Sequence, residues 1–181
     1  MAWYDLFSSF YDRSLEPLYR DARKAAAEAL DVKPGHIVLD LPTGTGQSLD
    51  ELVPLVGEEG RVLGVDLSPG MLAKARSRAA DRPTVSLHQA SVEAVCGALL
   101  EPLIGRTTVD RIHVFLGLTA FPDVQLAFDA LWSVLAPGGR MVIVDVFAET
   151  LTFQGRMVNL VARADIRRRV WEPLERVAAE Y

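Results

Sequence analysis

The chain has 181 residues; 50% of them are hydrophobic, 24% are charged, and the net charge at pH 7 is −5. This composition is typical of one soluble globular domain with a substantial buried core. The acidic balance disfavours a nucleic-acid partner, no apolar run reaches the roughly 18 residues of a membrane helix, and the first residues lack the pattern of a secretion signal. The single cysteine, Cys96, cannot form an internal disulfide, which favours a cytoplasmic location. The three histidines and this cysteine lack metal-ligand spacing, so we expect no metal site.

Apolar runs and helical spacings alternate along the chain. A first helix is expected from Ser14 to Lys33-Pro34-Gly35. The expected strands are residues 37–41, 61–66, 84–88, 109–116 and 141–147. Further helices are expected after Gly46, from Ser68 with Pro69 at its first position, near 93–100, and from Asp123 until Pro137-Gly138-Gly139 ends the helix.

This alternation predicts a doubly wound α/β fold, with a mainly parallel, Rossmann-like sheet of five strands and right-handed crossovers. Residues 149–181 are predicted to be helical throughout, with Trp171 and Val177 facing the core. We expect a single domain over residues 1–181, divided into an N-terminal helical segment (1–30), an α/β core (31–147) and a helical tail (148–181).

The residues with a chemical role are predicted where the first two strands end. The first apolar run stops at Asp40 and continues into a turn that contains Gly44 and Gly46. The second strand ends at Asp66, about 20 residues beyond Gly46, and this is the spacing at which an acid meets a ribose in doubly wound folds. An acid at the end of each strand, with glycines between them, predicts a nucleoside cofactor.

Four segments form one set of motifs: residues 38–46, 62–72, 110–123 and 135–144. With this set the chain resembles the class I S-adenosylmethionine-dependent methyltransferases, over about residues 1–147. Residues 3–12 also look like the N-terminal lid of the small-molecule members of ubiquinone/menaquinone and phospholipid type, so the segment 1–30 is expected to be a helical lid. The aromatic residues in it are at helical spacing, and a place in the core stays open as the alternative. The resemblance implies the class I methyltransferase fold, a core (31–147) that binds S-adenosylmethionine, and methyl transfer to a small or lipid-like acceptor.

The resemblance implies a role for each matching residue. Gly44 and Gly46 let the backbone approach the methionine part of the cofactor, and Asp40 holds the loop or the amino group, directly or through water. Asp66 accepts both ribose hydroxyls, because a carboxylate has the lone pairs to do so. The other positions implied at the cofactor are Pro42 and Thr43 in the loop, Leu67 and Met71 around the adenine, Ser91 and Val92 at its edge, and Tyr11 over the sulfonium.

An apolar acceptor pocket is expected near the end of the fourth strand. The residues expected there are Tyr4, Phe115, Leu116, Leu118 and Phe121. His113 lies within an apolar strand and is interpreted as a buried structural histidine. Because methyl transfer depends mainly on in-line alignment and needs little acid–base apparatus, the catalytic residue stays unassigned.

Three features depart from the family pattern. Pro42 stands where glycine is usual and Thr43 where a small residue is common, so the loop must differ slightly. Ser91 stands where an acid usually contacts the adenine amino group, and a charge-assisted contact is therefore lost. The usual antiparallel hairpin is missing after the fifth strand, whose edge is then open to pairing. C-terminal truncation is favoured, while cover by the tail helices and a homodimer through this edge stay open.

Two other functions fit part of the pattern. A NAD(P)-dependent oxidoreductase shares the Gly-x-Gly turn and the later acid, but Leu49 stands at the third glycine of that fingerprint and the chain has no Tyr-x-x-x-Lys pair. A non-catalytic domain for binding or assembly is favoured by Pro42, Ser91 and the missing hairpin. Binding of S-adenosylhomocysteine, of NADH or of neither would distinguish the three functions.

Overall fold

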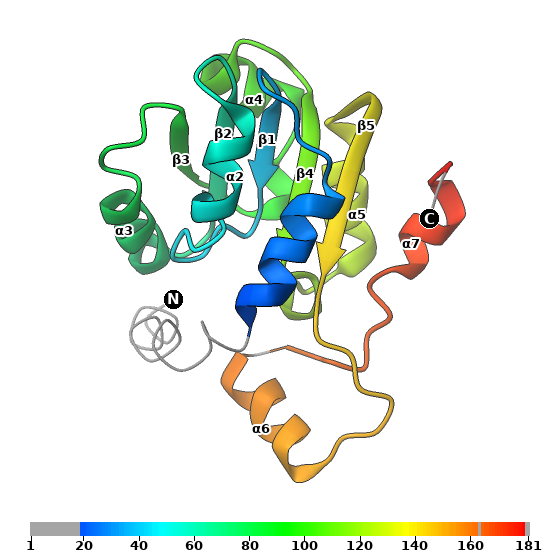
Figure 1. Cartoon of the computed structure of the whole chain (residues 1–181). Helices are drawn as coiled ribbons and strands as arrows, with labels where there is room; N and C mark the ends of the chain where they lie inside the picture. The colour runs from blue at the N-terminus through cyan, green and yellow to red at the C-terminus, as the bar shows by residue number, and fades with distance from the viewer. Residues whose placement is uncertain (1–18, 163, 180–181) are drawn as a thin grey trace.

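The computed structural model describes residues 19–162 and 164–179, in which helices and strands alternate (Figure 1). Ser14, Tyr4 and Tyr11 lie outside the described residues, and the chain is helical over residues 19–29. The elements that follow are β1 (Ile37–Asp40), α2 (Leu49–Val56), β2 (Arg61–Asp66), α3 (Pro69–Arg78), β3 (Val85–Gln89), the 3-10 helix η1 (Val92–Ala94), α4 (Gly97–Ile104), β4 (Val109–Phe115), the 3-10 helix η2 (Leu118–Ala120), α5 (Val124–Ser133), β5 (Leu135–Val144), α6 (Phe153–Ala162) and α7 (Glu172–Val177).

Five strands form one parallel sheet in the order β3-β2-β1-β4-β5, which confirms the predicted doubly wound fold. Val38 of β1 lies between Val62 of β2 and Arg111 of β4. The order of the strands reverses between β1 and β4, and open α/β sheets bind ligands outside the carboxyl ends of the strands at such a point. In Figure 1 the carboxyl ends of the strands point toward the side of the molecule where α6 lies.

The predicted helix starts at Ser68 and Asp123 are confirmed. The hydroxyl of Ser68 accepts the N–H of Met71 at 3.2 Å, and the carboxylate of Asp123 accepts the N–H of Leu126 at 2.9 Å. Each side chain satisfies one of the backbone donors left unpaired at a helix start. The helix predicted near 93–100 is instead divided into η1 and α4. Among the described helices, none combines the length and apolarity that crossing a membrane requires.

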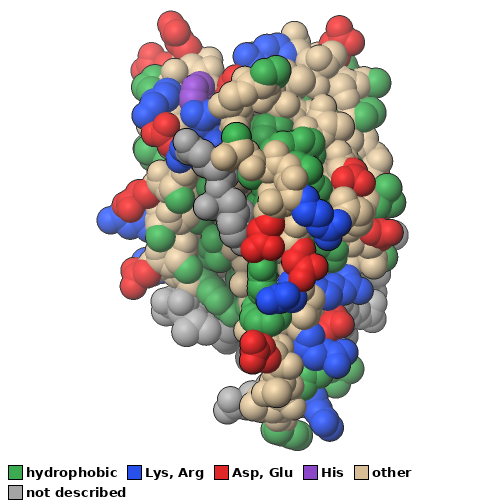
Figure 2. All heavy atoms as spheres, turned by 90° about the vertical axis from the view of Figure 1, so that its right-hand side faces the viewer, with side chains coloured by type: hydrophobic (Ala, Val, Ile, Leu, Met, Phe, Trp, Pro, Cys, Tyr) green, Lys and Arg blue, Asp and Glu red, His purple; other side chains and the backbone are tan. Residues whose placement is uncertain are grey.

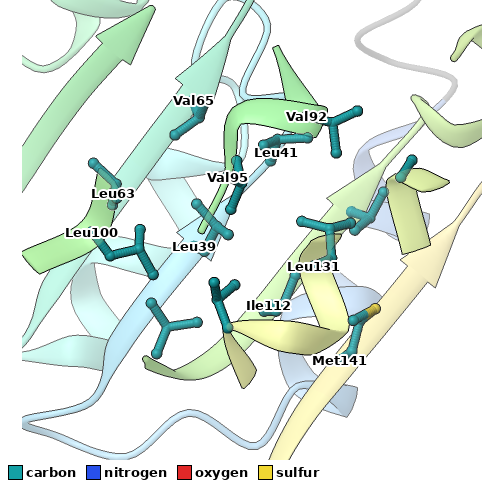
Figure 3. Close-up of a cluster of buried hydrophobic side chains, with 14 of the residues drawn as sticks. Leu39, Leu41, Leu63, Val65, Val92, Val95, Leu100, Ile112, Leu131 and Met141 are labelled. Carbon is teal, nitrogen blue, oxygen red and sulfur yellow. The ribbon is translucent and has the colours of Figure 1, made fainter. Parts of the chain in front are cut away.

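Side chains alternate between the two faces of the sheet, as the two-residue period of a strand requires. Val38 and Val62 belong to a cluster that includes buried residues of α2 and of helical residues 19–29. Leu39 and Leu63 belong to the larger cluster on the opposite face, with side chains from α4 and α5 (Figure 3). Both faces of the sheet are therefore covered, which explains the consecutive apolar residues in β1 and β2.

The start of the fifth strand differs from the prediction. β5 begins at Leu135, so Pro137-Gly138-Gly139 lies within the strand, and the preceding helix ends at Ser133. Gly139 is required there by close packing, because an added Cβ would lie 2.7 Å from the carbonyl oxygen of Ala136. The strand also ends earlier than expected, at Val144.

The tail is not helical throughout, which corrects the prediction for residues 149–181. Between α6 and α7, residues 164–171 contain no assigned helix, and Val170 is buried there in the core. The N–H of Asp165 donates to the carbonyl of Thr119 at 2.9 Å. These tertiary contacts outweigh local helix propensity. Val177, expected to face inward, is 49% exposed.

In the described part of the chain β5 is the edge of the sheet, and no antiparallel hairpin pairs with it. The tail instead contacts the segment after β5: the N–H of Ala148 donates to the carbonyl of Ile166 at 2.8 Å, and Trp171 packs edge-on against Phe147 with 4.8 Å between ring centroids. Figure 2 faces this side and shows hydrophobic side chains among acidic and basic ones. The tail packs near the end of β5 without adding a strand to the sheet.

Candidate functional site

The loop between β1 and α2 is fixed by the carboxylate of Asp40. This side chain is 1% exposed at the end of β1. Oδ2 accepts the hydroxyl of Thr43 at 2.6 Å, and Oδ1 lies 2.7 Å from Nδ1 of His113 on β4. Both oxygens therefore have a partner within the protein. Of the two roles implied for Asp40, the contact with the loop is the one observed.

Asp66, at the end of β2, is the second carboxylate of the site. Oδ2 accepts the N–H of Gly44 at 2.8 Å, and Oδ1 accepts the N–H of Ser68 at 2.8 Å. Burial raises the pKa of Asp66, and these two backbone donors oppose the shift because they favour the charged form. A carboxylate has lone pairs for about four donors, more than these backbone groups use. Asp66 thus ties the loop to β2 and retains acceptor capacity.

The two loop glycines have different surroundings. Gly44 has φ +56°, and a Cβ added there would meet no atom within 4 Å, so a ligand can approach this backbone closely. Gly46 has φ +80°, and its Cβ would lie 2.9 Å from Cδ1 of Leu49 and 3.1 Å from Cα of Ala75. The absence of a side chain at Gly46 allows α2 to pack closely against α3. Of the two glycines, only Gly44 leaves open space for the ligand that was expected to approach both.

A pocket of about 120 Å³ lies at the carboxyl ends of β1 and β2. It brings together five of the expected cofactor residues from separate elements. Met71, expected to cover the adenine, is 8% exposed on α3 and does not line this pocket, whereas Leu67 is 56% exposed and does. The lining residues are Leu41, Pro42, Val65, Asp66, Leu67, Ala90, Ser91, Val92, Glu93, Phe121 and Pro122.

The residues expected to line an acceptor pocket do not share one surface. Phe115 is buried against helical residues 19–29: its ring centroid lies 6.3 Å from that of Tyr19 and 5.3 Å from Cζ of Arg23. Its other neighbour is His113, whose ring stacks on it at 5.9 Å. Phe115 is therefore buried between β4 and helical residues 19–29 and does not line the pocket.

Leu118 is fully buried in the core, which corrects its expected place in an acceptor pocket. The reason is the anchoring of η2, because Oδ2 of Asp145 accepts the N–H groups of Gly117 at 3.1 Å and of Thr119 at 3.0 Å. Leu116 has φ +57° in the turn before η2. Phe121, which follows η2, lines the same pocket as the cofactor residues.

Two residues of the site were not identified from the sequence. Glu93 in η1 lines the pocket two positions after Ser91, which stands where the family pattern usually has an acid; its closeness to that position was the available signal. Gly117 packs against Pro42, since a Cβ at position 117 would lie 2.3 Å from Cδ of Pro42. A glycine on the β4 side thus accommodates the proline that departs from the family pattern.

The site fits a nucleoside ligand. Its walls are largely apolar, Asp66 keeps lone pairs for hydroxyl donors, and the backbone at Gly44 is open to close approach. Within the described ranges no three His, Cys, Asp or Glu side chains gather in a group that could hold a metal ion.

A family model for a methyltransferase domain matches residues 38–139, which is more than half of the chain and runs from β1 into β5. The chain belongs to the methyltransferase-domain family. The resemblance to class I methyltransferases is therefore confirmed. The matched range contains Asp40 and Asp66 and all the residues that line the pocket.

Two curated relatives of this methyltransferase-family chain are quinone enzymes by name. The demethylmenaquinone methyltransferase of Desulfitobacterium hafniense is 29% identical over 148 residues, which cover 82% of this chain and 56% of that protein. The ubiquinone/menaquinone biosynthesis C-methyltransferase UbiE of Cellvibrio japonicus is 33% identical over 144 residues, which cover 80% of this chain and 55% of that protein. The chain therefore spans about half the length of these relatives.

A solved structure shows the same fold. Phosphoethanolamine N-methyltransferase 2 of Haemonchus contortus, in complex with S-adenosyl-L-methionine, aligns with a TM-score of 0.66 at 19% identity over 95% of this chain and 43% of that one. At this identity the likeness concerns the fold.

Proposed function

We propose that this chain binds S-adenosylmethionine and transfers its methyl group to a small, lipid-like acceptor. The observation that carries the proposal is the pocket at the switch point of a methyltransferase-family sheet, where the buried carboxylate of Asp66 meets apolar walls and an open glycine, Gly44. Clefts of this kind bind a ligand largely through apolar contact and orient it with a few polar groups.

Each part of the pocket has a role in this proposal. Asp66 would accept the ribose hydroxyls with the acceptor capacity that remains beyond its bonds to backbone N–H groups. Leu67 and Val92 would cover the adenine and exclude water from it. S-adenosylmethionine, when bound, supplies a methyl group on a sulfonium, which is already a good leaving group. The chain then has mainly to orient the reactants and to keep the site partly desolvated.

The nature of the acceptor is inferred from relatives and from surface chemistry. One curated relative is named a demethylmenaquinone methyltransferase and the other a ubiquinone/menaquinone biosynthesis C-methyltransferase. Phe121 and Pro122 place apolar surface beside the Asp66 carboxylate. An acceptor with an aromatic or acyl part fits this surface better than a polyanion does. His113 is fully buried and paired with Asp40, so we assign no catalytic base.

Calorimetric titration with S-adenosylhomocysteine and with NADH tests the cofactor. Binding of the first and not of the second is expected. Binding of NADH alone would favour an oxidoreductase, and binding of neither would favour a non-catalytic domain that keeps the fold. The acceptor is then tested by transfer of a labelled methyl group to a demethylated quinone, with a phosphorylated sugar as the polar comparison. Transfer only to the polar compound would overturn the lipid-like acceptor.

For the free edge of β5 we propose pairing with the same edge of a second copy. β5 is ten residues long, and only its β4 side is paired within the described chain. An edge of this length presents unpaired backbone donors and acceptors to another strand. Light scattering over a range of concentrations is expected to give the molar mass of a dimer. A monomer at every concentration would overturn this proposal.

A further inference from the structure

We propose that Thr43 and His113 are positioning residues that hold Asp40 as an internal anchor of the cofactor loop, and that Asp40 makes no contact with the cofactor itself. The proposal rests on the proposed function, since it concerns the same site. It assigns a task to Thr43, which departs from the family pattern, and to His113, which lies outside the pocket.

The first step is the environment of the Asp40 carboxylate. With 1% exposure, it has almost no surface left for a ligand. Its two oxygens are engaged by different elements, Oδ2 by the Thr43 hydroxyl of the loop at 2.6 Å and Oδ1 by the His113 ring of β4 at 2.7 Å. The carboxylate therefore connects the loop to β4.

Thr43 connects the same loop to the neighbouring strand. Its N–H donates to the carbonyl of Val65 on β2 at 2.9 Å, and its own carbonyl accepts the N–H of Gly46 at 2.9 Å. Its side chain is 5% exposed and packs over Gly64, where an added Cβ would lie 2.8 Å from the Thr43 hydroxyl oxygen. Thr43 is thus fixed by its backbone and by its side chain at once.

The next residue, Gly44, links the fixed loop to the proposed ribose site. Its N–H donates to Oδ2 of Asp66, the carboxylate that lines the pocket. A loop fixed at Thr43 therefore presents Gly44 to Asp66 in one geometry. A site that is already ordered loses less entropy when a ligand binds. Loosening Thr43 should weaken every ligand that uses the ribose site, whatever else that ligand contains.

His113 completes the anchor from the other side of the switch point. Its side chain is fully buried, it stacks on Phe115, and Nε2 has no hydrogen-bond partner among the described residues. Asp40 is therefore the one hydrogen-bond partner of the ring among the described residues. This explains a polar residue in the middle of an apolar strand without assigning it a role in proton transfer.

The test compares two ligands that share the adenosine part. S-adenosylhomocysteine has the amino-acid part, and 5′-methylthioadenosine lacks it. The Thr43→Val substitution keeps the shape of the side chain but removes its donor, and we expect affinity for both ligands to fall by a similar factor, roughly fivefold. Thr43→Ser, which keeps the hydroxyl, should restore affinity to within about twofold of the original. The His113→Gln variant should weaken both ligands in the same way.

The control is Asp110→Ala, which removes a partly buried acceptor of the Ile37 N–H at the other end of β1 and β4. It should lower the melting temperature and leave both affinities unchanged. Thr43→Val that lowers the melting temperature but not affinity would reduce Thr43 to a structural residue and overturn the proposal. A loss confined to S-adenosylhomocysteine in the Thr43 or His113 variants would place Asp40 against the amino-acid part and overturn it too. If the unmodified chain binds neither ligand, the proposed function fails instead.

Discussion

The two sides of the carboxyl edge of the sheet are built in different ways. Beside β1 and β2, the loop residues Thr43 and Gly44 are hydrogen-bonded to Asp40 and Asp66, the acids that end the two strands. Beside β5, the chain is held by contacts with the distant tail, such as the bond between Ala148 and Ile166. The loop beside β1 and β2 is therefore held by the acids that end these two strands, and the segment after β5 by packing against the distant tail.

The comparison predicts that stability and cofactor affinity can be changed separately. Ile166 is 3% exposed in the tail, and Ile166→Ala should lower the free energy of unfolding by about 2–5 kcal/mol through lost burial and a cavity. Affinity for S-adenosylhomocysteine should be retained under conditions where the variant is folded. Urea denaturation and calorimetric titration measure the two quantities.

The control for this variant is Leu160→Ala on α6. Leu160 is 69% exposed, so its removal should change stability by no more than about 0.5 kcal/mol. If Ile166→Ala abolished binding in a folded protein, the two sides would not be independent.

The opposite result is expected at Asp66. Asp66→Ala should weaken S-adenosylhomocysteine by about 1–3 kcal/mol, because it removes the proposed ribose acceptor and leaves the Gly44 N–H without its partner. Asp123→Ala is the matched control, since Asp123 also accepts a backbone N–H at a helix start but lies outside the pocket. It should cost about 1 kcal/mol of stability and no affinity. Equal affinity in the Asp66 variant would contradict the ribose assignment.

A gain of affinity is expected at Ser91, where the family pattern has an acid. Ser91→Asp should tighten S-adenosylhomocysteine by about 1 kcal/mol, since a carboxylate makes a stronger hydrogen bond to the adenine amino group. S-inosylhomocysteine, which has an oxygen in place of that amino group, should not bind more tightly. Equal gains for both ligands would show that the contact is not with the amino group.

The smallest effect concerns Glu51 on α2. Burial raises the pKa of its carboxyl above the ordinary value of 4.5, with Arg23 opposing the shift. Ionisation of Glu51 therefore disfavours the folded state, and stability is lost as pH rises from 4.5 through the raised pKa. Glu51→Gln should be slightly more stable than the parent at pH 7 and equal to it well below pH 4.5. Urea denaturation at pH 7 and well below pH 4.5 checks the direction of the stability difference between the variant and the parent. Glu58→Gln is the control, because Glu58 is exposed.

Much of the cofactor side could be predicted from the sequence. Asp40 and Asp66 end their strands as expected, and Pro42, Leu67, Ser91 and Val92 line one pocket with Asp66. These positions follow strand ends and helix caps, which short segments determine. Gly46 and Met71 were expected in the same place but pack inside the fold, because periodicity does not tell which apolar or small residue a helix covers.

The sequence by itself determined the alternation of strands and helices, the parallel sheet and the two acids at its edge, because each depends on local periodicity, capping and strand polarity. Only the tertiary structure determined that Asp40 is paired with His113, that Gly117 accommodates Pro42 and that Leu118 belongs to the core. The first two pairings join residues more than 70 positions apart, and no local pattern encodes which distant side chain will lie opposite. The prediction of a continuous helix over residues 149–181 was wrong for the same reason, because Val170 packs into the core and residues 164–171 are not helical.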